Sequence, residues 1–116
     1  MQNNTAGHLA EYVARWYMRL HGYRILAANI VTGRGTHAGE VDFIAKRGKT
    51  LAFVEVKKRA TLEEAAYAIK TTQQQRIRNG AQVFLKKNPQ FQNCEIRFDA
   101  ILVVFPCTIH HIPNAW

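Results

Sequence analysis

The sequence predicts an α/β fold with helices on both sides of a mixed β-sheet. Three observations predict it: an early segment with helical apolar spacing, two short apolar runs joined by a polar connection, and a late run that is apolar throughout. The chain has 116 residues, of which 47% are hydrophobic and 21% charged, so it can fill its own core and lacks the composition of a disordered segment. We expect one domain over residues 1–116.

The first predicted element is a helix over residues 5–21. Apolar residues recur there at helical spacing: Leu9, Val13, Trp16 and Leu20. Gly22 is placed to end this helix. The short apolar segment 23–31 then predicts a strand, which leads into a glycine-rich loop over residues 32–39.

The middle of the chain predicts a hairpin followed by helix. The apolar runs 40–45 and 51–57 should pair antiparallel, because their connection is short, polar and contains glycine. Residues 63–87 have a broadly helical pattern, interrupted near residues 71–72 by threonines of low helix propensity, so two helical pieces are expected. The run 97–105 suits a strand buried on both faces.

The chain is strongly basic, with 16 Lys and Arg against 8 Asp and Glu and a formal net charge of +8. This charge favours a polyanionic partner, nucleic acid first and an anionic membrane second, because Lys and Arg neutralise phosphates and release counterions. No window approaches the ~20 continuous apolar residues of a spanning helix, and the first residues lack a signal-peptide core. We therefore expect a cytoplasmic protein that binds nucleic acid.

The cysteines indicate no special chemistry. Cys94 and Cys107 are the only two and form no C-x-x-C pair, so neither a disulfide framework nor a cysteine zinc site is predicted. Cys107 lies near His110 and His111 in the sequence, but no second ligand pair stands at useful spacing, so a zinc site there is the weaker interpretation.

The scarce acidic residues gather in the predicted hairpin, which holds Glu40, Asp42 and Glu55. Side chains alternate along a strand, so Glu55 and Lys57 share a face, and pairing of the two runs brings Asp42 near Glu55. Charge at the end of a buried strand is costly unless it is compensated. The hairpin is therefore the main candidate for a site.

Two interpretations of these charges stay open. Mg²⁺ prefers oxygen ligands and is commonly held by one or two carboxylates, which Asp42 and Glu55 would supply. Lys57 would then stabilise charge on a phosphate or orient the attacking water. Alternatively, Asp42 or Glu55 pairs with Lys57 or Arg59 for stability alone. The order and spacing of these residues in a basic chain favour the metal site.

Several motifs together carry a resemblance that covers most of the chain: Gly7-His8-Leu9-Ala10-Glu11, His21-Gly22-Tyr23, Gly39-Glu40-Val41-Asp42-Phe43-Ile44-Ala45, Phe53-Val54-Glu55-Val56-Lys57-Lys58-Arg59 and Arg97-Phe98-Asp99. With these motifs the sequence resembles the PD-(D/E)XK nuclease superfamily and, more narrowly, the YraN family of bacteria. The resemblance implies a restriction-endonuclease-like fold of three layers, with a central mixed sheet flanked by helices.

The resemblance also implies a metal-dependent endonuclease that uses Mg²⁺ or Mn²⁺. Asp42 and Glu55 would ligate the metal, the Val56 carbonyl would complete its coordination, and Lys57 would assist the water or the phosphate. Glu11 would contribute from the first helix. Without the resemblance, Glu11 is most simply an acid that complements the dipole at the start of a helix.

One position departs from the family pattern. Such relatives often have a lysine in the helix after the active strand, whereas this chain has Gln73 there, which would still bind phosphate or water. Basic residues near these motifs are predicted to contact nucleic acid: Arg34, Lys58, Arg59, Arg76 and Arg78. For the helical arginines, an ordinary solvated helix face is the alternative.

The leading hypothesis is a DNA endonuclease that hydrolyses phosphodiester bonds in branched or junction DNA. A homodimer would suit two-fold junction substrates. The alternatives are a non-catalytic nucleic-acid-binding module on a nuclease-like scaffold, and a structural or interaction protein with a basic surface.

Overall fold

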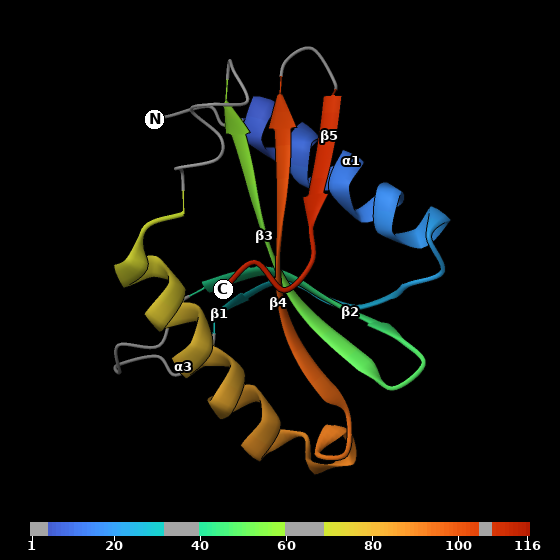
Figure 1. Ribbon diagram of the computed structural model, residues 1–116, viewed down its shortest axis with the longest axis vertical. Coiled ribbons are helices and arrows are strands. Elements are labelled where there is room, and N and C mark those ends of the chain that lie inside the picture. The colour runs from blue at the N-terminus through green and yellow to red at the C-terminus, as the bar shows by residue number, and fades with distance from the viewer. Residues whose placement is uncertain (1–4, 32–39, 60–68, 105–107) are drawn as a thin grey trace.

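A five-stranded mixed sheet lies between two helices in the described part of the chain (Figure 1). The computed structural model describes residues 5–31, 40–59, 69–104 and 108–116, with the backbone alone for residues 5–8, 29–31, 40 and 59. The elements are α1 (Thr5–Leu20), β1 (Arg24–Val31), β2 (Glu40–Arg47), β3 (Thr50–Arg59), α3 (Thr71–Lys87), the short 3-10 helix η1 (Pro89–Phe91), β4 (Glu95–Val104) and β5 (Thr108–Ile112).

The strands lie side by side in their sequence order, from β1 to β5. Only β3 and β4 run parallel, and the other neighbouring strands pair antiparallel. Antiparallel neighbours can be joined directly, whereas the parallel pair needs a crossover, which contains α3. The crossover places α3 against the sheet after the strand that carries Glu55.

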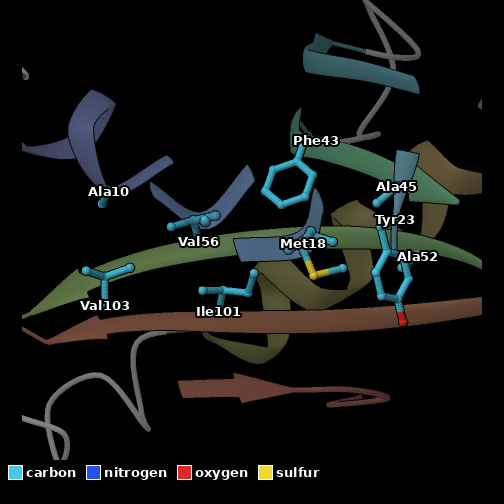
Figure 2. Packing of buried hydrophobic residues seen from close by; sticks show 11 residues of the cluster. Ala10, Met18, Tyr23, Phe43, Ala45, Ala52, Val56, Ile101 and Val103 are labelled. Carbon is cyan, nitrogen blue, oxygen red and sulfur yellow. The ribbon is translucent and has the colours of Figure 1, made fainter. Parts of the chain in front are cut away.

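Helix α1 covers one face of the sheet. Its buried residues recur one turn apart, at Ala10, Ala14 and Met18, and they pack against Ala52, Val54 and Val56 of β3. Figure 2 shows this cluster, with side chains of α1 and of the strands pointing toward one another. The helix ends before Gly22, whose φ of +89° is a conformation that glycine adopts without strain.

Helix α3 covers the other face. Ile77 and Ala81 pack with Leu51 and Phe53 of β3, and the ring of Phe84 meets that of Phe53 edge to face at 5.8 Å between centroids. Leu51 and Phe53 alternate with the residues that face α1, as the pleat of a strand requires. Glu55 continues this series, so it lies on the α3 side of the sheet.

The structure confirms the α/β prediction, with a mixed sheet between helices as in a restriction-endonuclease-like fold. It also confirms the first helix, the antiparallel hairpin and the strand buried on both faces. Of the two helical pieces expected over residues 63–87, the second is α3, and residues 63–68 lie outside the described residues, as does the loop 32–39. Strand β5 was not predicted.

Helices long and apolar enough to span a membrane are absent from the described ranges.

Candidate metal centre

The sheet opens between β2 and β3 where the acidic residues stand. Pairing of these strands ends at Phe43 and Val54, although β2 continues to Glu40 beside β1, and β3 continues to Arg59 beside β4. We call this opening, between residues 40–42 of β2 and 55–59 of β3, the fork. One position further along the same register, Asp42 comes opposite Glu55. The fork therefore brings the two predicted metal ligands together.

The Asp42 carboxylate takes the place of a backbone acceptor in the fork. Its Oδ2 accepts a hydrogen bond from the backbone N–H of Val56 at 2.7 Å. In an extended strand the N–H and C=O of one residue point to the same side, so the Val56 carbonyl is also on the side of the fork. The Asp42 side chain thus binds β3 at a position where the backbones of β2 and β3 are no longer paired.

Glu55 lies at the centre of the polar contacts, although it is only 4% exposed. Its Oε2 accepts a hydrogen bond from Nε2 of Gln73 on α3, and Nζ of Lys57 lies 3.4 Å from the same oxygen. The buried carboxyl group of Glu55 is therefore surrounded by three other predicted site residues: Asp42 of β2, Lys57 of β3 and Gln73 of α3.

The pKa of Glu55 is raised from its ordinary value of 4.5 to about 8, and burial is the largest cause. The charge of Asp42 and a hydrogen bond between the two carboxyl groups contribute to this rise, and the nearby Lys57 ammonium partly opposes it. A second positive charge in the fork would stabilise the ionised form of Glu55. This is the electrostatic condition under which a carboxylate pair binds a cation.

The donor atoms of the fork suit a small hard cation. Asp42 and Glu55 offer carboxylate oxygens and Val56 a carbonyl oxygen, which are ligands that Mg²⁺ prefers, whereas zinc sites are built from Cys and His. Nowhere in the described ranges do three or more His, Cys, Asp or Glu side chains gather as a metal-binding group. Mg²⁺ needs no such cluster, because one or two carboxylates commonly suffice and water completes the shell.

Glu11 is the site residue predicted from the first helix. It lies on α1, which covers the opposite face of the sheet, and its Oε1 is 4.0 Å from Nη1 of Arg15 in the next turn. Its contribution to the site stays a prediction.

The predicted nucleic-acid contacts fall in several places. Arg76 is exposed on α3 one turn from Gln73, on the same side of the helix. Arg78 is also exposed, and its guanidinium lies 4.9 Å from the ring centroid of Phe98. Lys58 is half-buried on β3. Arg34 and the side chain of Arg59 lie outside the described residues.

A second polar cluster, around Asp99, was not expected from the residue pattern. Asp99 is fully buried, and Arg97 donates to both of its oxygens, from Nε at 2.8 Å and Nη2 at 2.7 Å. His111 Nε2 lies 2.8 Å from Oδ2, and the Asn114 N–H donates to Oδ1 at 3.1 Å. Burial alone would raise the pKa of Asp99, but these hydrogen bonds hold it below its ordinary value of 3.8.

This cluster also bears on the zinc interpretation. His111 is engaged by Asp99 rather than by other metal-binding side chains of the described residues, and Cys107 lies outside them. The only sequence signal for the cluster was the motif Arg97-Phe98-Asp99. That motif did not indicate the partner histidine, because β5 itself was not predicted.

Residues 10–103 match the family model described as uncharacterised protein family UPF0102. The chain belongs to this family. UPF0102 is the YraN family, so the resemblance seen in the sequence is confirmed. A UPF0102 protein of Paramagnetospirillum magneticum is 47% identical over 110 residues, which cover 95% of this chain and 85% of that protein. One of Nitrobacter winogradskyi is 48% identical over 98 residues, which cover 84% and 80%.

Among solved structures, this UPF0102 chain has a likeness to SfsA of Pyrococcus furiosus, determined in complex with Ca²⁺. The TM-score is 0.33 with 14% sequence identity, and the match covers 91% of this chain. The chain spans 60% of the length of SfsA. A likeness of this extent supports no conclusion about the site.

Proposed function

We propose that this UPF0102 protein is a metal-dependent endonuclease that hydrolyses phosphodiester bonds of DNA, with Mg²⁺ or Mn²⁺ held in the fork. The observation that carries the proposal is the buried Glu55 beside Asp42 at an opening in the sheet, with Lys57 and Gln73 both in contact with the Glu55 carboxyl group. A buried acid whose pKa is raised by burial and by a neighbouring carboxylate is typical of functional sites.

Each side chain has a role in this proposal. Asp42, Glu55 and the Val56 carbonyl would hold the metal, which when bound lowers the pKa of a water ligand and polarises the phosphate. The Lys57 ammonium, 3.4 Å from Glu55, would neutralise charge that develops on the phosphate oxygens. The Gln73 amide would orient the water or the phosphate, because it offers both a donor and an acceptor.

Charge and architecture support DNA as the substrate. The net charge of +8 supplies the field that attracts a polyanion, and Arg76 lies exposed beside Gln73. The described residues form one sheet with a helix on each face and include no second unit that would read base sequence. We therefore propose that the protein recognises structure, such as a branch or junction, and that a homodimer would match the two-fold symmetry of a junction.

A cleavage assay with Mg²⁺ or Mn²⁺ over duplex, flap, junction and RNA substrates tests the proposal. Asp42→Asn and Lys57→Ala should each lower the cleavage rate by on the order of 10²-fold or more, the usual effect of removing a charge-stabilising group. Glu95→Gln is the matched control, since Glu95 is an exposed acid at the start of β4, away from the fork. Equal activity of all four proteins would exclude a catalytic fork.

A second candidate is a nucleic-acid-binding module without catalysis. Lys57 and Gln73 already contact the Glu55 carboxyl group within the protein, as they would in a purely structural ion pair. In that case the wild type binds DNA and cuts none of the substrates, and Asp42→Asn and Lys57→Ala leave binding unchanged.

A further inference from the structure

We propose that Trp116 is a positioning residue for the fork. Together with Ile69 it holds the first turn of α3, so that Gln73 reaches Glu55. The catalytic consequence rests on the proposed function, whereas the positioning itself is a property of the protein without metal or DNA. The family model ends at residue 103, so the segment that contains Trp116 lies beyond the matched region.

Residues 113–116 are fixed to the sheet by β4. The Asn114 N–H donates to the buried Asp99, and the Ala115 N–H donates to the Phe98 carbonyl at 2.7 Å. Asn114 has a φ of +52°, in the left-handed region that asparagine tolerates, and the chain turns back there. Figure 1 shows the chain after β5 crossing β4 and ending on the side of α3.

The Trp116 ring packs directly beside the fork. It stacks on Phe98 with centroids 5.9 Å apart, and it packs against Ala100 and Leu102 of β4 together with Ile69. In the parallel register of β3 and β4, Ala100 is the partner of Glu55 and Leu102 is the partner of Lys57. Trp116 and Ile69 therefore cover the strand next to the acidic pair.

Helix α3 needs this support at its start. Within the described residues its buried positions are Ile77, Gly80 and Ala81, all beyond Gln73, and Lys70 at the N-cap makes no side-chain capping bond. Ile69 stands just before the helix, and its carbonyl accepts a hydrogen bond from Nε2 of Gln74 at 3.2 Å. Ile69 and Trp116 pack against the same two residues of β4, so Ile69 places the start of the helix next to the surface that Trp116 covers.

The indole N–H takes no part in this role. Nε1 of Trp116 is buried and has no hydrogen-bond partner among the described residues. Trp116→Phe keeps an aromatic ring on Phe98 and removes an unsatisfied donor, so it should preserve the position of α3. Trp116→Ala removes the ring altogether. The two variants separate ring packing from hydrogen bonding.

Nuclear magnetic resonance of the Gln73 side-chain amide, recorded without metal or DNA, tests the proposal. Trp116→Ala and Ile69→Ala should each shift or broaden the Gln73 amide signals, and Trp116→Phe should leave them in place. The same two alanine variants should weaken binding of Mn²⁺ alone by about tenfold, the usual effect of losing a residue that orients a ligand.

Two controls separate positioning from general destabilisation. Trp16→Ala removes the same side chain from the exposed face of α1, on the opposite side of the sheet. Phe91→Ala removes a ring stacked on Phe84 near the far end of α3. Neither should move the Gln73 signals, even where the melting temperature falls.

Unchanged Gln73 signals in folded Trp116→Ala and Ile69→Ala proteins would overturn the proposal. An equal change in Phe91→Ala would also overturn it, because the effect would then be global. Since the signals are recorded without substrate, a wild type that cuts no DNA leaves this test intact and contradicts only the proposed function. If the wild type does cut, Trp116→Ala should lower kcat more than it raises KM.

Discussion

The charge of Glu55 depends strongly on its surroundings. Its pKa in the folded protein, about 8, lies above the ordinary value of 4.5 that it regains on unfolding. The folded state therefore binds more protons than the unfolded state between these values, and stability falls as the pH rises through this range. Protonation and cation binding are two ways to neutralise the same buried group.

We predict that the free energy of unfolding of the metal-free protein decreases between pH 4.5 and pH 8, and that Glu55→Gln removes most of this decrease, because glutamine has no proton to lose. Urea unfolding in the presence of a chelator, over a series of pH values, measures it. Added Mg²⁺ should restore stability to the wild type at the alkaline end and leave Glu55→Gln nearly unaffected. Parallel pH profiles of the two proteins would contradict the prediction.

The turn at Gly48 joins the two strands that carry the carboxylates. Gly48 has a φ of +59°, and no atom lies within 4 Å of where a Cβ would stand, so the cost of a side chain there is conformational and not steric. Gly48→Ala should destabilise the protein by ~1–2 kcal/mol, and Gly48→Asn by less, because asparagine tolerates left-handed backbone. Denaturant unfolding of the two variants measures this, and equal losses would count against the explanation.

The elements themselves differ in how far the sequence predicts them. The sequence predicts helix α1 correctly, but it predicts the wrong buried face. Leu9, Trp16 and Leu20 are 59%, 46% and 79% exposed. The buried residues are instead Ala10, Ala14 and Met18. Apolar residues stand on both sides of this helix, and alanines give a weak hydrophobic signal. Which side meets the sheet depends on tertiary packing.

Strand β5 is an element that the sequence does not predict. Its residues Thr108–Ile112 place two histidines between apolar positions, which is a poor strand signal. Pairing with β4 and the contact of His111 with Asp99 stabilise the strand, and neither is visible in a local window.

The sequence also predicts only part of the candidate site. The proximity of Asp42 and Glu55 follows from strand alternation and hairpin register, so the sequence predicts it. The contact of Gln73 with Glu55 requires α3 to dock on the sheet at one particular height, and only the folded molecule supplies that information.

At the scale of the whole molecule, the charge of +8 predicts that any binding of nucleic acid weakens as the salt concentration rises. If Arg76 contacts a phosphate, Arg76→Ala should reduce the slope of log K against log salt by about 0.9. Lys49→Ala is the matched control, because Lys49 is exposed in the hairpin turn at the far end of β2 and β3 from the fork. A fluorescence-anisotropy titration in several salt concentrations measures both slopes, and equal reductions would show that Arg76 acts only through net charge.

The fork has a mechanical consequence. Its two carboxylates stand on adjacent strands of a single hairpin. The paired part of the hairpin, from Phe43 and Val54 to the turn, therefore limits how far the backbones at Asp42 and Glu55 can separate. Sites assembled from loops adjust to a ligand by local bending. Here the ladder holds the backbone one residue from each acid, so the span between the acids changes mainly through their side-chain torsions, and the fork should accept cations within a limited range of radius.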